Sequence, residues 1–171
     1  TPSMLKDVGA EYVIVGHSER RADGETDETV AKKVLTILEA GMTPIVCIGE
    51  RERDKDGHYL AGLEASLLTS TARIEPASLK KIIIAYEPVW AVGASTTPTA
   101  REIREVIIFI RKVLATRFDR AAALKVRILY GGDVNDSNIA SLIAESDASG
   151  FLIGRASVDV TAFSVIVKTF S

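Results

Sequence analysis

The sequence predicts an α/β fold in which helices cover a parallel sheet. Short apolar segments alternate along the chain with longer segments whose apolar residues recur at helical spacing. The short segments are continuously apolar and do not alternate with polar residues, which is typical of parallel strands buried on both faces. Five strand–helix units of this kind fit either an open doubly wound sheet or part of a (β/α)8 barrel.

The first two units occupy the N-terminal 71 residues. An apolar strand is expected over 12–16, followed by a helix over 28–40 with Val30, Val34, Leu35 and Leu38 on one face. Gly41 ends this helix, because glycine readily adopts the left-handed conformation of a helix C-terminus. A second strand is expected over 43–48 and a second helix over 60–71.

The third unit begins with a strand over 81–86. Thr97 followed by Pro98 suggests the N-cap and first-turn proline of the next helix. The apolar residues of that helix recur at helical spacing and predict its buried face: Ile103, Val106, Ile107, Ile110, Val113 and Leu114.

The last two units are shorter. The fourth strand is expected over 125–130 with a short helix over 138–144, and the fifth strand over 150–153 with a final helix over 158–170. Since no linker or low-complexity segment interrupts the series, residues 1–171 are expected to form a single domain.

Composition excludes several classes of protein. The net charge of −2 provides no basic field for nucleic acid, and no apolar run reaches transmembrane length. Cys47 is the single cysteine, so no internal disulfide can form, which fits the reducing cytoplasm. Thr1 stands where an initiator methionine would be, which suggests a chain that begins within a longer protein.

Polar or glycine-rich segments follow all five expected strands. They are 16–21, 49–51, the segment beginning at Glu87, 130–134 and 154–157. Because ligand sites of parallel α/β folds lie at the carboxyl ends of the strands, these segments are the candidates for a shared active face.

Two side chains at strand ends could carry proton chemistry. Glu87 ends an apolar strand and is followed by Pro88, Trp90 and Gly93, a pattern that suggests a rigidly mounted general base beneath a segment that closes over it. His17 could be a neutral hydrogen-bond donor, a proton shuttle or a structural histidine. His58 lies in a charged stretch and is interpreted as a solvated surface residue.

Glycines after the last two strands could hold an anion. Gly131, Gly132 and Gly154 each precede a helical segment, so backbone N–H groups and the helix N-terminus could bind a phosphate, although such glycines also mark ordinary tight turns. One cysteine and two distant histidines form no metal-ligand cluster, and a dinucleotide fingerprint is absent. Cys47 is interpreted as a core residue, and Glu50 and Trp90 as structural residues.

Four of these segments resemble the triosephosphate isomerase family, in order and in register. Residues 12–21 resemble its electrophile segment, 85–93 its base and lid, and 130–134 and 150–154 its phosphate loops. The resemblance covers essentially the whole chain. It implies a partial (β/α)8 TIM barrel, with parallel strands and covering helices that correspond to units four to eight.

The resemblance implies the interconversion of D-glyceraldehyde 3-phosphate and dihydroxyacetone phosphate, in glycolysis and gluconeogenesis, by a cytoplasmic homodimer without cofactor or metal. Glu87 would remove the proton next to the carbonyl, and His17 would polarise the carbonyl and stabilise the enediolate. The lid, residues 88–98, would exclude water. The phosphate would be bound by the backbone N–H groups of Gly93, Asp133, Gly154 and Arg155.

The chain departs from the family in what it lacks. The family barrel has eight units in roughly 250 residues, and this chain resembles only the last five. The family's asparagine–x–lysine element is missing, because neither Asn135 nor Asn138 has a lysine two residues on. We therefore expect part of a longer isomerase, or a natural truncation that assembles with itself. The alternatives are a non-catalytic phosphate-binding or structural remnant that needs the missing N-terminal half, and a different phosphosugar barrel enzyme.

Individual positions also depart from the family pattern. Ser95 and Thr96 stand where the family has glycine and lysine, and Arg155 replaces a second glycine. Asp133 replaces a serine, and its carboxylate would repel a dianionic phosphate unless it turned away or paired with a cation. Five barrel strands alone would also leave two open edges and one uncovered core face, which predicts self-association or a need for the missing units.

Overall fold

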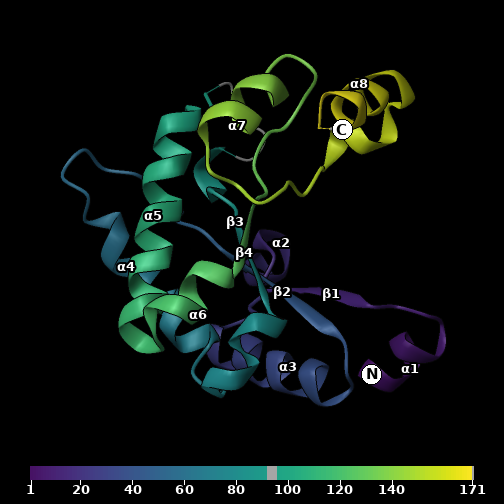
Figure 1. Cartoon of the computed structure of the whole chain (residues 1–171), viewed down its shortest axis with the longest axis vertical. Helices are drawn as coiled ribbons and strands as arrows, with labels where there is room; N and C mark the ends of the chain where they lie inside the picture. Colours follow the sequence, from purple (N-terminus) through teal and green to yellow (C-terminus); the bar gives the residue numbers. More distant parts are fainter. Residues whose placement is uncertain (92–95, 171) are drawn as a thin grey trace.

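A four-stranded parallel sheet forms the centre of the computed structural model, which describes residues 1–91 and 96–170 (Figure 1). Its strands are β1 (Tyr12–Val15), β2 (Thr43–Ile48), β3 (Ile83–Tyr86) and β4 (Arg127–Tyr130). The spatial order β1-β2-β3-β4 is the order of the sequence. A doubly wound sheet reverses its strand order at a switch point, so this steady progression is that of a barrel segment.

The remaining elements are helices. Figure 1 shows α4, α5 and α6 on one side of the strands and α1 and α8, near the chain ends, away from that group. No helix in the described part of the chain is both long and apolar enough to cross a membrane. The α-helices are α1 (Pro2–Asp7), α2 (Ser18–Ala22), α3 (Asp27–Glu39), α4 (Tyr59–Ser70), α5 (Ala100–Arg117), α6 (Arg120–Lys125), α7 (Ile139–Glu145) and α8 (Val160–Phe170), and the 3-10 helices are η1 (Pro76–Lys81), η2 (Val89–Ala91) and η3 (Arg155–Val158).

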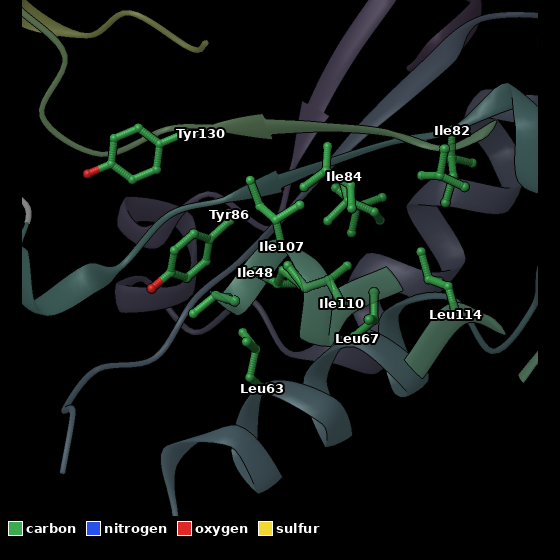
Figure 2. Close-up of a cluster of buried hydrophobic side chains, with 14 of the residues drawn as sticks. Ile48, Leu63, Leu67, Ile82, Ile84, Tyr86, Ile107, Ile110, Leu114 and Tyr130 are labelled. Atoms are coloured by element: carbon green, nitrogen blue, oxygen red, sulfur yellow. The ribbon is translucent and has the colours of Figure 1, made fainter. Parts of the chain in front are cut away.

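The main core lies between the sheet and α3, α4 and α5. Val46 pairs with Ile84, which pairs with Ile128, so alternate strand residues form rows that face the helices. Figure 2 shows side chains of α4 and α5, among them Leu67 and Ile110, meeting these rows. The rings of Tyr86 and Tyr130 lie at one end of the cluster, with both hydroxyl groups pointing away from it (Figure 2). All six residues predicted for the buried face of α5 are buried.

The start of α5 differs from the prediction. The N-cap is Thr99, not Thr97, and Pro98 precedes the helix. Thr99 and Glu102 form a capping box, in which Glu102 N–H donates to Thr99 Oγ1 at 3.3 Å and Thr99 N–H donates to Glu102 Oε2 at 2.7 Å. Ala100 stands three residues after Thr97 and offers no such carboxylate, so the box selects Thr99.

The prediction of a fifth strand over 150–153 is wrong, because these residues form only one bridge. They do lie beside β4, where a fifth strand was expected. A single parallel bridge joins Phe151 to Tyr130, since Tyr130 N–H donates to Gly150 O and Leu152 N–H donates to Tyr130 O. Gly154 is the N-cap of η3, which follows and ends the pairing. The strands expected from 81 and 125 begin two residues later because η1 and α6 extend through Lys81 and Lys125.

The opposite face of the sheet is only partly covered. Cys47 and Ala85 are buried there, because Leu129 and Leu152 pack against them. On β1, however, Tyr12 and Ile14 are each 50% exposed. The uncovered face expected for a partial barrel is therefore confined largely to the β1 edge, where no further strand pairs among the described residues.

Two isoleucines of α5 provide a matched test of the core. Ile107 is fully buried and Ile108 is 53% exposed on the same helix. We expect Ile107→Ala to lower the free energy of unfolding by about 2–5 kcal/mol, because it leaves a cavity among packed side chains. Ile108→Ala should change the same free energy by about 0.5 kcal/mol or less. Urea unfolding of both variants measures the difference, and equal losses would contradict the packing described.

Candidate active site

A cavity of about 390 Å³ opens at the carboxyl ends of the strands. Residues from five separate segments border it, and they include most of those singled out in the sequence. The bordering residues are Ile14, His17, Glu19, Cys47, Glu87, Gly131, Gly132, Asp133, Val134, Leu152, Ile153, Gly154, Arg155 and Ala156.

Glu87 is fixed at the end of β3 by both backbone and side chain. Its N–H donates to Ile48 O at 2.8 Å, which continues the pairing of β3 with β2. Gly49 approaches so closely that a Cβ there would lie 1.7 Å from Glu87 O, so only glycine fits. The carboxylate is 5% exposed and accepts hydrogen bonds from Ser18 N–H at 3.0 Å and from Ser18 Oγ at 2.9 Å.

His17 lies against the same carboxylate. Its Nε2 is 3.0 Å from Glu87 Oε1, and its Nδ1 accepts a hydrogen bond from Glu19 N–H at 3.4 Å. An accepting Nδ1 carries no proton in the neutral ring, so the neutral tautomer has its proton on Nε2, directed at Glu87. The carboxylate and the imidazole N–H face one cavity. The carboxylate could accept a proton from a bound molecule, and the imidazole N–H could donate a hydrogen bond to the same molecule.

A polar network positions the turn that presents His17. Gly16 adopts a φ of +71°, and its N–H donates to Glu25 Oε2 at 2.8 Å. Arg21 donates to Gly16 O at 2.6 Å, to Cys47 O at 3.1 Å and to Asp27 Oδ1 at 2.6 Å. One guanidinium thus joins the ends of β1 and β2 to the start of α3.

No motif in the sequence assigns a role to Ser18, Arg21, Glu25 or Asp27. Arg21 and Asp27 are six residues apart across a turn, and Ser66 and Ser70 of α4 also donate to Asp27 Oδ1. The available signal was the high density of charged residues over 19–28, which is also typical of a solvated loop.

Glu25 is held in its ionised form. Burial raises the pKa of Glu25, but hydrogen bonds from Lys33 and from Gly16 N–H, with the charges of Lys33 and Arg21, outweigh burial and lower the pKa overall. The carboxylate therefore stabilises the fold most where it is charged.

Glu50 anchors the segment that follows Glu87. Its carboxylate accepts hydrogen bonds from Tyr86 Oη at 2.9 Å and Trp90 Nε1 at 2.8 Å, and its carbonyl oxygen accepts from Val89 N–H at 3.0 Å. Burial and the Glu50 charge raise the pKa of Tyr86, so its hydroxyl stays a donor. These contacts support the structural interpretation of Glu50 and Trp90.

The two glycine loops meet at the cavity. Gly131 N–H donates to Tyr86 O at 2.9 Å, and a Cβ at Gly132 would lie 2.2 Å from the Tyr130 hydroxyl, so the loop passes directly over that ring. The Asp133 carboxylate accepts from Asn135 Nδ2 at 2.8 Å and is bound within its own loop. Gly154 and Arg155 border the cavity from the start of η3.

Gly93, predicted to bind phosphate, lies outside the described residues, as does Ser95, while Thr96 is described. Cys47 is 1% exposed, and burial raises its pKa to about 12, which supports a core residue over a nucleophile.

His58 is exposed, as interpreted, and forms a surface group with Asp54 and Asp56 whose potential metal ligands lie within 4.8 Å of one another. Asp54 also accepts three backbone N–H bonds, from Asp56, His58 and Tyr59, at the start of α4. This local capping explains the arrangement without an ion.

An acid and a histidine over a cavity bordered by glycine loops, at the carboxyl edge of a barrel segment, define an enzyme of the proton-transfer class. The family model described as triosephosphate isomerase matches residues 1–170. The chain therefore belongs to the triosephosphate isomerase family.

Three curated relatives illustrate the extent of the similarity. The triosephosphate isomerase of Carboxydothermus hydrogenoformans is 45% identical over 98% of this chain and 68% of its own length. That of Moorella thermoacetica is 45% identical over 96% of this chain and 67% of its own. That of Hyphomonas neptunium is 46% identical, over 96% and 66%. The chain thus spans about two thirds of their length.

The lowered pKa of Glu25 predicts a pH-dependent stability. A carboxylate with a lowered folded-state pKa stabilises the fold above its unfolded-state pKa, near the ordinary 4.5, and loses this contribution as the pH falls through the folded-state value. We expect Glu25→Gln to lower the free energy of unfolding at pH 7, with a smaller deficit below pH 4.5. Glu64→Gln, on the exposed face of α4, is the control. Urea unfolding from pH 3 to 7 measures this, and a deficit that grows toward acid would contradict it.

Proposed function

We propose that this chain carries the proton-transfer site of a triosephosphate isomerase, with Glu87 as the base and His17 as the electrophile. The observation that supports this most directly is the 3.0 Å contact between His17 Nε2 and Glu87 Oε1 at the cavity. The reaction would interconvert D-glyceraldehyde 3-phosphate and dihydroxyacetone phosphate through an enediolate, with no cofactor.

The resting contact explains how substrate would activate the base. The Nε2–H of His17 points at Glu87, yet the same N–H would polarise a substrate carbonyl. A bound carbonyl oxygen would compete with the carboxylate for this proton. Glu87 would then lose one of its hydrogen-bond donors as substrate binds and become a stronger base toward the adjacent C–H group.

The phosphate would lie between the two glycine loops. Backbone N–H groups of Asp133, Gly154 and Arg155, with that of Gly93, are proposed to hold it, and the lid over residues 88–98 would close above it. The Asp133 carboxylate is engaged with Asn135 Nδ2, which favours an arrangement in which it faces its own loop.

Assembly would complete the site. The half-exposed Tyr12 and Ile14 and the apolar surface of α8 are the kind of surface that a further chain segment or second protein buries. We propose that the 171 residues act as one domain whose open face is covered either by further βα units or by another copy of the chain. A cytoplasmic homodimer, as the family resemblance implies, is the corresponding proposal for the complete enzyme.

Replacement of the base tests the proposed chemistry. Glu87→Gln keeps the shape of the side chain but removes its ability to accept a proton, and we expect about a 10²- to 10⁴-fold loss in kcat. Glu145→Gln, exposed on α7, should leave kcat unchanged. The assay follows isomerisation of glyceraldehyde 3-phosphate by the purified chain, alone and with the first three βα units of a relative added in trans.

The outcomes separate the candidate functions. Activity only after complementation would support a split barrel with its base in this chain. Activity that survives Glu87→Gln would contradict the assigned base. A folded chain that is inactive under both conditions would favour the non-catalytic remnant.

The open face predicts self-association. We expect the isolated chain to sediment as a concentration-dependent oligomer, and Ile14→Asn to shift it toward monomer because the half-exposed apolar side chain is lost from the contact. Ile143→Asn, on α7 and 40% exposed, is the matched control. Analytical ultracentrifugation decides between these outcomes, and equal effects of the two substitutions would argue against the β1 edge as the contact.

A further inference from the structure

The described border of the cavity has an unfavourable charge for a phosphate ester. Three of its residues are carboxylates, Glu19, Glu87 and Asp133, whereas Arg155 is its one lysine or arginine within the described ranges. A phosphate monoester carries about −1.5 to −2 charges at pH 7. Backbone N–H groups contribute only partial positive charge, so binding of the dianion calls for a full cation.

Arg155 is available for this role. Its residue is exposed at the rim of the cavity, and its guanidinium makes no hydrogen bond, ion pair or ring contact with residues 1–91 or 96–170. Several other arginines are engaged: Arg21 with Asp27, Arg104 with Asp147, and Arg111 with carbonyl oxygens at the C-terminal end of α6. Nothing described therefore holds the Arg155 side chain away from the cavity.

The nearby Asp133 carboxylate is not paired with Arg155 and is held within its own loop. Asp133 Oδ2 accepts from Asn135 Nδ2 at 2.8 Å, and the Asp133 carbonyl oxygen accepts from Asn138 Nδ2 at 2.9 Å. These two contacts hold Asp133 within the loop after β4, and its carboxylate forms no ion pair with Arg155. The guanidinium is left without an ionic partner at the edge of a site whose proposed ligand is an anion.

We propose that the Arg155 side chain, and not only its backbone N–H, binds the phosphate of the substrate. This proposal rests on the proposed function of the same site and specifies its ligand as a phosphomonoester dianion. A guanidinium presents two parallel N–H groups that match two phosphate oxygens, so one side chain supplies both charge and orientation. The contact persists throughout the reaction, because the phosphate does not react.

Inorganic phosphate is a suitable probe, because its binding does not require catalysis. The purified chain is titrated at constant ionic strength, and amide shifts of Gly131, Gly132 and Gly154 are followed by NMR. We expect saturable shifts. Arg155→Gln should weaken the phosphate affinity about tenfold, and Arg155→Lys should restore it in part, since lysine keeps the charge but lacks the paired N–H groups of the guanidinium. Arg120→Gln, exposed on α6, removes the same charge elsewhere and should leave the affinity unchanged.

Two results would overturn the proposal. Equal phosphate affinity of the chain and Arg155→Gln would show that the side chain contributes nothing, and equal losses in Arg155→Gln and Arg120→Gln would indicate only a general charge effect. Under the isomerase assay, Arg155→Gln should raise KM with little change in kcat, because the contact is the same in ground and transition states. If the chain showed no isomerisation that depends on Glu87, the proposed function would be refuted. If phosphate affinity did not depend on Arg155, only the present proposal would be refuted.

Discussion

The arrangement of the site depends on the hydrogen bonds that the Arg21 guanidinium donates. It donates to the carbonyl oxygens of Gly16 and Cys47, at the ends of β1 and β2, and forms an ion pair with Asp27 at the start of α3. Both strand ends would otherwise present unpaired carbonyl oxygens in a partly buried place, which costs free energy. One planar cation satisfies them together and fixes the distance between the two strand ends.

The contacts of Arg21 are continuous with those that position His17 and Glu87. The Gly16 turn orients His17 and begins α2, whose first residue, Ser18, reaches the carboxylate of Glu87. Glu87 is in turn held by the pairing of β3 with β2 and by contact with Gly49. Glu87 and His17 follow different strands, yet each is positioned through contacts with β2 or the residue after it.

The sequence predicted the elements whose signals are local and repetitive. The apolar residues of β2, β3, α3 and α5 are buried along most of each element. Their spacing therefore predicted the positions of these elements closely. The N-cap of α5 was misplaced because Thr97 and Thr99 are both acceptable caps, and only the reciprocal bond to Glu102 distinguishes them. The fifth strand was overestimated because apolar composition does not reveal that pairing stops at Phe151.

Site residues in local motifs could also be predicted from the sequence, whereas those that depend on distant partners could not. His17, Glu87 and the glycine loops stand at strand ends and in recognisable motifs, and the fold gathers them at one cavity. Ser18, Arg21 and Glu25 could not be assigned, because their roles depend on partners distant in sequence, on the register between strands, and on which charges the fold desolvates. A single sequence carries no direct signal of these properties.

Two adjacent residues, His17 and Ser18, supply all three hydrogen bonds that the Glu87 carboxylate receives from this segment. They stand on one short backbone stretch at the start of α2, so neither can shift far without the other. A movement of that stretch would release both carboxylate oxygens together, and its return would recapture both. The hydrogen bonds that Glu87 receives from this stretch are therefore gained or lost together and not one at a time.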